Sequence, residues 1–345
     1  MTKTDSLMFK GIAILFMLWH HLFWSDYYNH YYTAIGLKVF GKSIELQSAN
    51  VIDPVPFFLF LSGYGLYKLY CSHQGSTLSL AVLWANVKRV LRLYIHYWIT
   101  LAVFLIVGAC MFGTSKYPGS MSVLLGNITG ISGFFDFYNP DVWFLFPYAQ
   151  MVILSGVFYL FVSRCHWLVA LLTAIALHIL QFDYWYAQVY AVTYHIKPIL
   201  LPFLLGMISA KAIDFGKLRT FFRSRALLGY ALVLAYCVGF GYAFLRLNAG
   251  HLQSFSAAVF IILCAGLPVP GVVSRVLCAM GRRSTSMWFI HSWFCHILFQ
   301  PFIYSFKYSL LIFAVLVIIS YLCSIPTDYV NARILRLLHL AKNKA

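Results

Sequence analysis

Long apolar stretches alternate with short polar segments along the whole chain. A helix needs around 20 residues to cross a hydrocarbon core about 30 Å thick, so each stretch predicts one membrane-spanning helix. We expect ten spans, at residues 7–24, 51–70, 90–112, 143–163, 167–182, 198–213, 226–245, 252–268, 286–303 and 310–325. The pattern therefore predicts an all-α, polytopic integral membrane protein.

Composition supports the same fold class and indicates no separate soluble part. Hydrophobic residues make up 62% of the 345 residues and charged residues 10%, and the mean hydropathy is +0.80. So few charged residues cannot cover the surface of a water-soluble core of this size. No low-complexity tract or internal repeat interrupts the spans, and no small-residue cleavage site follows the first one. We expect a single membrane-embedded domain over residues 1–345, with the first span retained.

Positive charge is distributed unevenly between the two sides of the expected membrane. The net charge is +16, from 25 Lys and Arg against 9 Asp and Glu. With the amino terminus inside, 19 basic residues fall on the cytoplasmic side and six on the outer side. Cytoplasmic segments of membrane proteins carry such an excess of Lys and Arg. The distribution predicts that both termini are cytoplasmic, and it accounts for the basic charge without a nucleic-acid partner.

Lys10 and His21 form the most informative pair in the first apolar stretch. They are eleven residues apart, which places both side chains within about 20° of each other on a helix, separated by about 16 Å of rise. Ionisable groups inside a membrane segment are costly and commonly serve pathways or chemistry. The alternative is a lysine that extends to the membrane surface and a histidine that hydrogen-bonds a neighbouring helix.

Arg89 and Arg92 open the third predicted span. They are at positions i and i+3, so their guanidinium groups emerge near each other at the cytoplasmic end of one helix. Two permanently charged, planar groups suit the oxygens of a phosphate. The alternative is that the pair only fixes the orientation of the helix in the membrane.

Acidic residues are few, and four of them fall toward the outer side: Asp53, Asp136, Asp141 and Asp183. Any of these carboxylates would be able to orient a histidine or to bind a sugar hydroxyl. The alternative is a carboxylate in a solvated loop. Asp53 stands out because Pro54 and Pro56 follow it at the head of the second span.

Four short motifs follow one another along the chain. They are KGIAIL at 10–15, ahead of His20 and His21; FFLFLSGYG at 57–65; RVLR at 89–92; and GRRSTSMWFIH at 281–291. The sequence WFL at 143–145 is a weaker fifth motif. This set, in this order, resembles the acyltransferase 3 family of integral-membrane acyl transferases, and the resemblance covers essentially the whole chain.

The resemblance implies acyl transfer from a coenzyme A thioester. Lys10, Arg89 and Arg92 are then expected to hold the phosphates of cytoplasmic acyl-coenzyme A, with its pantetheine arm running toward His21. His21 is expected to act as the general base on an acceptor hydroxyl, or to carry the acyl group covalently. His20 lies about 80° from Lys10 on the helix and is the second choice; a kink would reverse that order.

Four further residues are expected to contact substrate: Ser62, Gly63, Trp143 and His291. Small residues such as Ser62 and Gly63 also allow close helix packing, and a buried histidine such as His291 also ties helices together. We expect His178 and His296 to be structural. Three features depart from the family pattern: Lys10 replaces an arginine found in many relatives, no proline follows the paired arginines after a short interval, and no glutamate follows shortly after Trp143.

The predicted function is transfer of an acyl group, acetyl in the first instance, to a hydroxyl of a cell-surface carbohydrate or lipid-linked glycan at the cell membrane. We expect no metal and no permanently bound cofactor, because the eight cysteines lack metal-site spacing. An exporter of a glycan or lipid is the alternative, although it would need no basic-plus-histidine site on the first helix. A non-catalytic scaffold is third, and the buried polar residues argue against it. The sequence leaves the acceptor, the acyl chain and the oligomeric state open.

Overall fold

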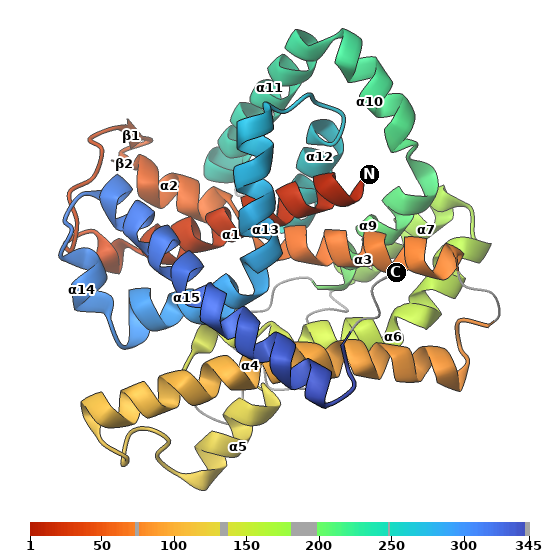
Figure 1. The fold of residues 1–345 in the computed structure, drawn as a ribbon. Helices are drawn as coiled ribbons and strands as arrows, with labels where there is room; N and C mark the ends of the chain where they lie inside the picture. Colours follow the sequence, from red (N-terminus) through yellow and green to blue (C-terminus); the bar gives the residue numbers. More distant parts are fainter. Residues whose placement is uncertain (73–75, 132–136, 181–198, 248, 342–345) are drawn as a thin grey trace.

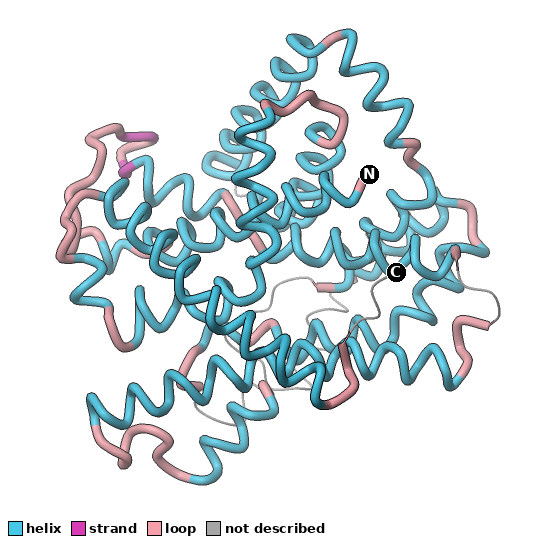
Figure 2. The backbone as a smooth tube through the Cα atoms, viewed as in Figure 1, coloured by secondary structure: helices cyan, strands magenta, loops and turns pink. Residues whose placement is uncertain are grey.

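The computed structural model describes residues 1–72, 76–131, 137–180, 199–247 and 249–341, almost entirely as helices (Figures 1 and 2). The longer helices are α1 (Lys3–Phe23), α3 (Val55–Cys71), α4 (Leu80–Phe112), α6 (Leu145–Arg164), α7 (Trp167–Ile179), α9 (Leu200–Ala212), α11 (Ala226–Leu247), α12 (Gln253–Cys264), α13 (Gly271–Ser292) and α15 (Ser309–Leu337). The shorter ones are α2 (Ile44–Val51), α5 (Met121–Thr129), α10 (Phe215–Ser224) and α14 (Gln300–Tyr304). The all-α fold class is confirmed.

Each of the ten predicted spans contains a helix, but the helices differ in their ability to cross a membrane. Within the described residues, five segments are long and apolar enough: Lys3–Phe23, Leu80–Phe112, Pro140–Arg164, Ala226–Leu247 and Ser309–Leu337. Three apolar helices are shorter: Trp167–Ile179, Leu200–Ala212 and Gln253–Cys264. The count of ten spans and the cytoplasmic position of both termini therefore stay predictions.

The ninth predicted span is not one straight helix. Its first residues belong to α13, which continues into a π-helical turn, η4 (Trp293–Ile297), and then into α14. The helix is interrupted just before Pro301, which lies in the first turn of α14. Proline has no N–H to donate and its ring clashes with the preceding turn, so an α-helix cannot run through this point undisturbed.

Glycines bring α1 and α13 into close contact near the centre of Figure 1. A Cβ atom added at Gly11 would lie 2.1 Å from the carbonyl oxygen of Leu277, and one at Gly281 would lie 1.9 Å from that of Leu7. Only glycine permits backbones to approach this closely. Further along, the rings of His21 and His291 lie 5.0 Å apart. The two helices therefore run side by side in the same direction and bring both histidines together.

A second close approach joins α3 and α9. A Cβ atom at Gly63 would lie 2.0 Å from the carbonyl oxygen of Phe203, and one at Gly206 would lie 2.1 Å from that of Phe60. Gly63, expected to contact substrate, is thus placed in a helix–helix contact. The packing alternative accounts for its position.

Several elements were not predicted from the apolar pattern. They are α2, α5, α10 and the two-stranded ribbon of β1 (Lys38–Val39) and β2 (Lys42–Ser43). Polar residues interrupt α2 and α10, so neither forms a long apolar stretch. Some sequence predictions fall outside the described residues: those for Asp136, Asp183, Lys197, Lys342 and Lys344, and the adjoining ends of the fifth and sixth spans.

Candidate active site

His21, Asp141, His291 and His296 gather at one end of α1, and we call them the His–Asp cluster. His21 lies in the last turn of α1, and Asp141 lies in the short helix η2 (Pro140–Val142) ahead of α6. His291 lies on α13 and His296 on η4. His21 Nδ1 is 3.4 Å from Asp141 Oδ1, and the two side chains are only 14% and 13% exposed. The ring of His296 lies 5.7 Å from that of His21. Four titratable side chains from three segments of the chain therefore share one buried site.

Asp141 is held by its backbone on both sides. The Asn139 side chain caps η2 and accepts a hydrogen bond from the Asp141 N–H at 3.1 Å. On the other side, Trp288 Nε1 donates to the carbonyl oxygen of Asp141 at 3.3 Å. The second contact ties η2 to α13. These bonds fix the carboxylate opposite His21 and leave its oxygens available for the imidazole.

The other two histidines are oriented by their own hydrogen bonds. His291 Nδ1 lies 2.7 Å from the carbonyl oxygen of Trp288, so this nitrogen carries the proton and donates it. His296 Nδ1 lies 3.0 Å from the Tyr28 hydroxyl. Tyr28 lies outside the predicted spans, and burial raises the pKa of its hydroxyl to about 12. Tyr28 therefore keeps its proton near neutral pH, and the hydrogen bond connects η1 (Asp26–Tyr28) to η4.

His20 and His21 face different neighbours. His20 Nδ1 lies 2.7 Å from the carbonyl oxygen of Ala49 on α2, whereas His21 faces Asp141. The choice of His21 over His20 as the base stays a prediction. His20 connects α1 to α2.

Two atoms of the His–Asp cluster are buried without a hydrogen bond in the described part of the chain. They are His21 Nδ1, which lies 3.4 Å from Asp141 Oδ1 without hydrogen-bond geometry, and Asp141 Oδ2. Buried polar atoms are nearly always paired, and exceptions are frequent at functional sites. Ligand atoms of His21, Asp141 and His291 also lie within 4.8 Å of one another. By donor type these three residues fit a Zn²⁺ ion.

The two arginines of the RVLR motif point to different elements. Arg89 donates from Nη1 to Asn86 Oδ1 at 2.7 Å and borders a cavity of about 220 Å³ between α3 and α4. Arg92 donates from Nε to the carbonyl oxygen of Leu340, at 2.6 Å, in the turn that follows α15. The expected phosphate clamp is therefore not preassembled. Arg92 would have to exchange the Leu340 carbonyl for a phosphate.

The remaining predicted residues lie on the helices around this cavity and the His–Asp cluster. Ser62 Oγ on α3 is 3.0 Å from the Tyr148 hydroxyl on α6. Trp143, buried at the start of α6, lies two residues after Asp141. Lys10 is partly buried on α1, next to the Gly11 contact with α13. Ser62 thus links α3 to the helix that follows Asp141.

A second polar cluster was missed from the sequence. Ser286 Oγ lies 2.7 Å from His96 Nε2 and donates to Asp328 Oδ1. Asp328 also forms an ion pair with Arg283, at 2.8 Å. The sequence signals were a lone aspartate just beyond the last predicted span, and His96, which lies seven residues after Arg89 and so on the same helix face. This cluster connects α4, α13 and α15 and fixes the helix that carries His291.

Comparison with known proteins gives the family. The model of an acyltransferase domain, acyltransferase 3, matches residues 8–329. The chain belongs to the acyltransferase 3 family. It is accordingly a membrane acyltransferase in general terms, as the four motifs predicted. No curated protein and no solved structure gives a significant match.

Proposed function

We propose that this protein transfers an acyl group, acetyl in the first instance, from cytoplasmic acyl-coenzyme A to a hydroxyl of a cell-surface carbohydrate or lipid-linked glycan. The reaction takes place in the cell membrane, which the chain crosses several times. The observation that carries the proposal is the buried contact of His21 with Asp141, at 3.4 Å, in a chain of the acyltransferase 3 family.

His21 acts as the general base. Its Nδ1 faces Asp141, so a proton on Nδ1 is directed to the carboxylate and Nε2 keeps its lone pair. Nε2 takes the proton of the acceptor hydroxyl as the hydroxyl oxygen attacks the thioester carbonyl. The new C–O bond forms, the C–S bond breaks, and the imidazolium returns the proton to the coenzyme A thiolate. Asp141 stabilises the imidazolium while it exists.

Arg89, Arg92 and Lys10 bind the phosphates of the donor. The predicted orientation of the chain puts all three at the cytoplasmic side, where acyl-coenzyme A is found. Arg89 borders the cavity of about 220 Å³, and Arg92 gives up its contact with the Leu340 carbonyl when a phosphate arrives. Guanidinium groups bind phosphate oxygens through charge-assisted hydrogen bonds.

The acceptor approaches from the opposite side. Trp24, Tyr27 and Tyr31 are exposed there, close in sequence to His21, and aromatic rings of this kind stack on sugar rings. Trp143, Ser62 and His291 surround the path between the two substrates. His291 lies next to His21, with ring centres 5.0 Å apart, and contacts the acceptor.

The experiment is acyl transfer by the purified protein in nanodiscs, measured as release of free coenzyme A. His21→Ala should lower the rate about 10²- to 10⁴-fold, because it removes the base. Acyl-coenzyme A binding should be retained, because the arginines are untouched. His20→Ala is the matched control and should keep most of the rate. Full transfer by His21→Ala would refute the mechanism, and glycan flux without any acyl transfer would favour an exporter.

A further inference from the structure

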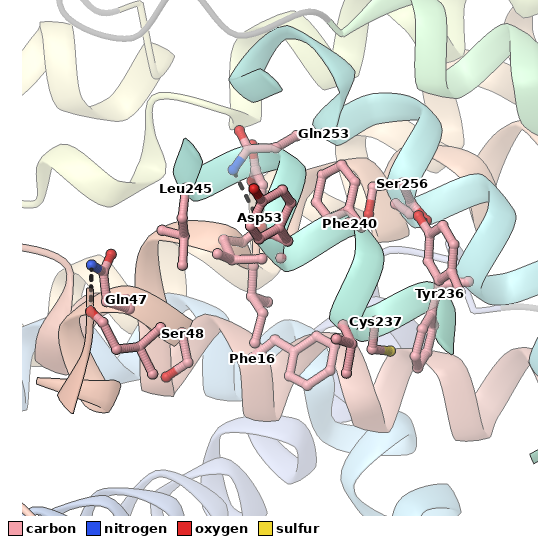
Figure 3. Close-up of a pocket in the computed structure, with 18 of the residues that line it drawn as sticks. Phe16, Gln47, Ser48, Asp53, Tyr236, Cys237, Phe240, Leu245, Gln253 and Ser256 are labelled. Carbon is pink, nitrogen blue, oxygen red and sulfur yellow. Dashed lines mark hydrogen bonds between the residues drawn. The ribbon is translucent and has the colours of Figure 1, made fainter. Parts of the chain in front are cut away.

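A large cavity lies away from the His–Asp cluster. It has a volume of about 570 Å³ and is bordered by α1, α2, α3, α11 and α12 (Figure 3). Phe16, Phe57 and Phe260 form its inner wall, and Tyr236 to Leu245 of α11 form the opposite one. No member of the His–Asp cluster lines it. The cavity therefore needs an explanation separate from acyl transfer.

The cavity extends along α11. Its lining there runs from Tyr236 to Leu245, a stretch of ten residues, which corresponds to roughly 14 Å of helix rise. Figure 3 shows Tyr236 and Cys237 at one end and Leu245 and Gln47 toward the other, with Phe16 and Phe240 between them. This shape suits an alkyl chain.

The polar groups in the lining are already engaged by the protein. Gln47 Nε2 donates to the carbonyl oxygen of Val39 at 3.1 Å, and Gln253 Nε2 donates to that of Asn50 at 3.0 Å. Asp53 Oδ1 accepts from the N–H of Val55 at 3.1 Å. Water in a cavity needs two to four polar partners, so an apolar occupant is favoured.

The outer wall of this cavity is a helix with an exposed apolar surface. This helix, α11, is the least buried of the five candidate spans: only 6% of its most apolar window is buried. Its exposed side chains include Leu232 and Leu234, which do not line the cavity. A helix of this kind faces lipid on its outer side, so acyl chains are the apolar molecules nearest to the cavity.

The positively charged side chain of Arg246 lies at the end of the cavity, near the C-terminus of α11. The Arg246 guanidinium carbon lies 4.0 Å from the ring centre of Phe40, which lines the cavity. Phe40 has a backbone φ of 50°, in the left-handed region that non-glycine residues rarely adopt. In the described part of the chain, no carboxylate forms an ion pair with Arg246. The guanidinium is thus positioned to bind an anion where a chain would leave the cavity.

We propose that this cavity binds an acyl chain of a membrane phospholipid, with Arg246 on the lipid phosphate. The alkyl chain fills the space between α11 and the helices α1, α3 and α12. The bound lipid replaces contacts that α11 lacks with the rest of the protein, and so stabilises its position. This role does not depend on acyl transfer, and its test uses no activity measurement.

Two glycines on α11 provide a matched pair of variants. A Cβ atom at Gly241 or at Gly239 would meet nothing within 4 Å, but only Gly241 lines the cavity. Gly241→Leu therefore fills the cavity without a clash, and Gly239→Leu makes the same chemical change on the same helix outside it. Arg246→Gln removes the charge at the end of the cavity.

The probes are dioctanoyl phosphatidylglycerol and dioctanoylglycerol, which share their chains and differ in the phosphate headgroup. Binding to the full protein in neutral detergent is measured by native mass spectrometry. The wild type and Gly239→Leu should bind the phospholipid at least about tenfold more tightly than the diacylglycerol. Gly241→Leu should weaken phospholipid binding about tenfold or more. Arg246→Gln should remove the preference for the phosphate.

The proposal has three outcomes that would overturn it. Equal phospholipid affinity in Gly241→Leu and Gly239→Leu would show that the chain does not occupy the cavity. Equal binding of both probes by the wild type would show that no phosphate is recognised. An unchanged preference in Arg246→Gln would place the phosphate elsewhere.

Discussion

Replacing Gly281 by alanine should separate the two helices that carry His21 and His291. The added methyl group would lie 1.9 Å from the Leu7 carbonyl oxygen, where an ordinary contact begins at 3.4 Å. To restore an ordinary contact, α1 and α13 must move apart by the difference, about 1.5 Å. The neighbouring atoms are backbone, so no side chain can rotate away to make room.

The expected cost follows from this geometry. Overpacking of a close contact costs about 1–3 kcal/mol. At an open helical position, by contrast, the same change of glycine to alanine gains up to about 1 kcal/mol. Gly239 is at such a position, because a Cβ atom added there meets nothing within 4 Å. The two variants should therefore differ by about 1–4 kcal/mol in stability. Because His21 and His291 move relative to each other, Gly281→Ala should also lose about 100-fold in transfer rate.

The assay is thermal unfolding of both variants in the same detergent, followed by acyl transfer at a temperature where both are folded. Gly281→Ala should unfold at a lower temperature than the wild type, and Gly239→Ala at an equal or higher one. If both variants matched the wild type in unfolding temperature and rate, the close approach of α1 and α13 would be wrong. Loss of stability with a full rate would show that helix spacing does not set the site geometry.

Three further predictions concern Asp141, Arg89 and metal binding at His21. Asp141→Asn should lower kcat about 10²- to 10⁴-fold and leave the KM for acetyl-coenzyme A unchanged, because the imidazolium loses its counter-charge; steady-state kinetics measure this, and a changed KM alone would contradict it. Arg89→Gln should raise the KM for acetyl-coenzyme A about tenfold at low salt and less at high salt, whereas Lys88→Gln should have little effect; equal KM values in both variants would remove Arg89 from the donor site. Treatment with a zinc chelator should leave the transfer rate unchanged, because the mechanism uses His21 as a base and needs no metal ion there. If the chelator inactivated the protein and added Zn²⁺ restored the activity, His21 would be a metal ligand instead.

The apolar pattern located the helices well because helix formation in a membrane depends on local composition. It missed α2 and α10, which are short and polar. Their positions depend on tertiary contacts, such as the hydrogen bond from His20 to Ala49. The bend at η4 was also missed: Pro301 lies within residues 286–303 and signals a break, but the apolar pattern predicted one continuous span.

The site could be predicted only in part. Helix geometry singled out His21 over His20, and motif order added His291. Asp141 was one of four candidate carboxylates, and Asp53 was singled out instead, because nothing local shows which loop folds back onto α1. His296 was expected to be structural, yet its ring lies 5.7 Å from that of His21. These residues come together only through the packing of α1 against α13, which a single sequence does not encode locally.

The central claim is that His21 is the base for acyl transfer. Its most direct test is the rate of acetyl-coenzyme A turnover by His21→Ala in nanodiscs, measured beside acetyl-coenzyme A binding and beside His20→Ala. We predict a loss of about 10²- to 10⁴-fold in turnover with donor binding retained, and little change in His20→Ala. Turnover by His21→Ala at the wild-type rate would contradict the claim.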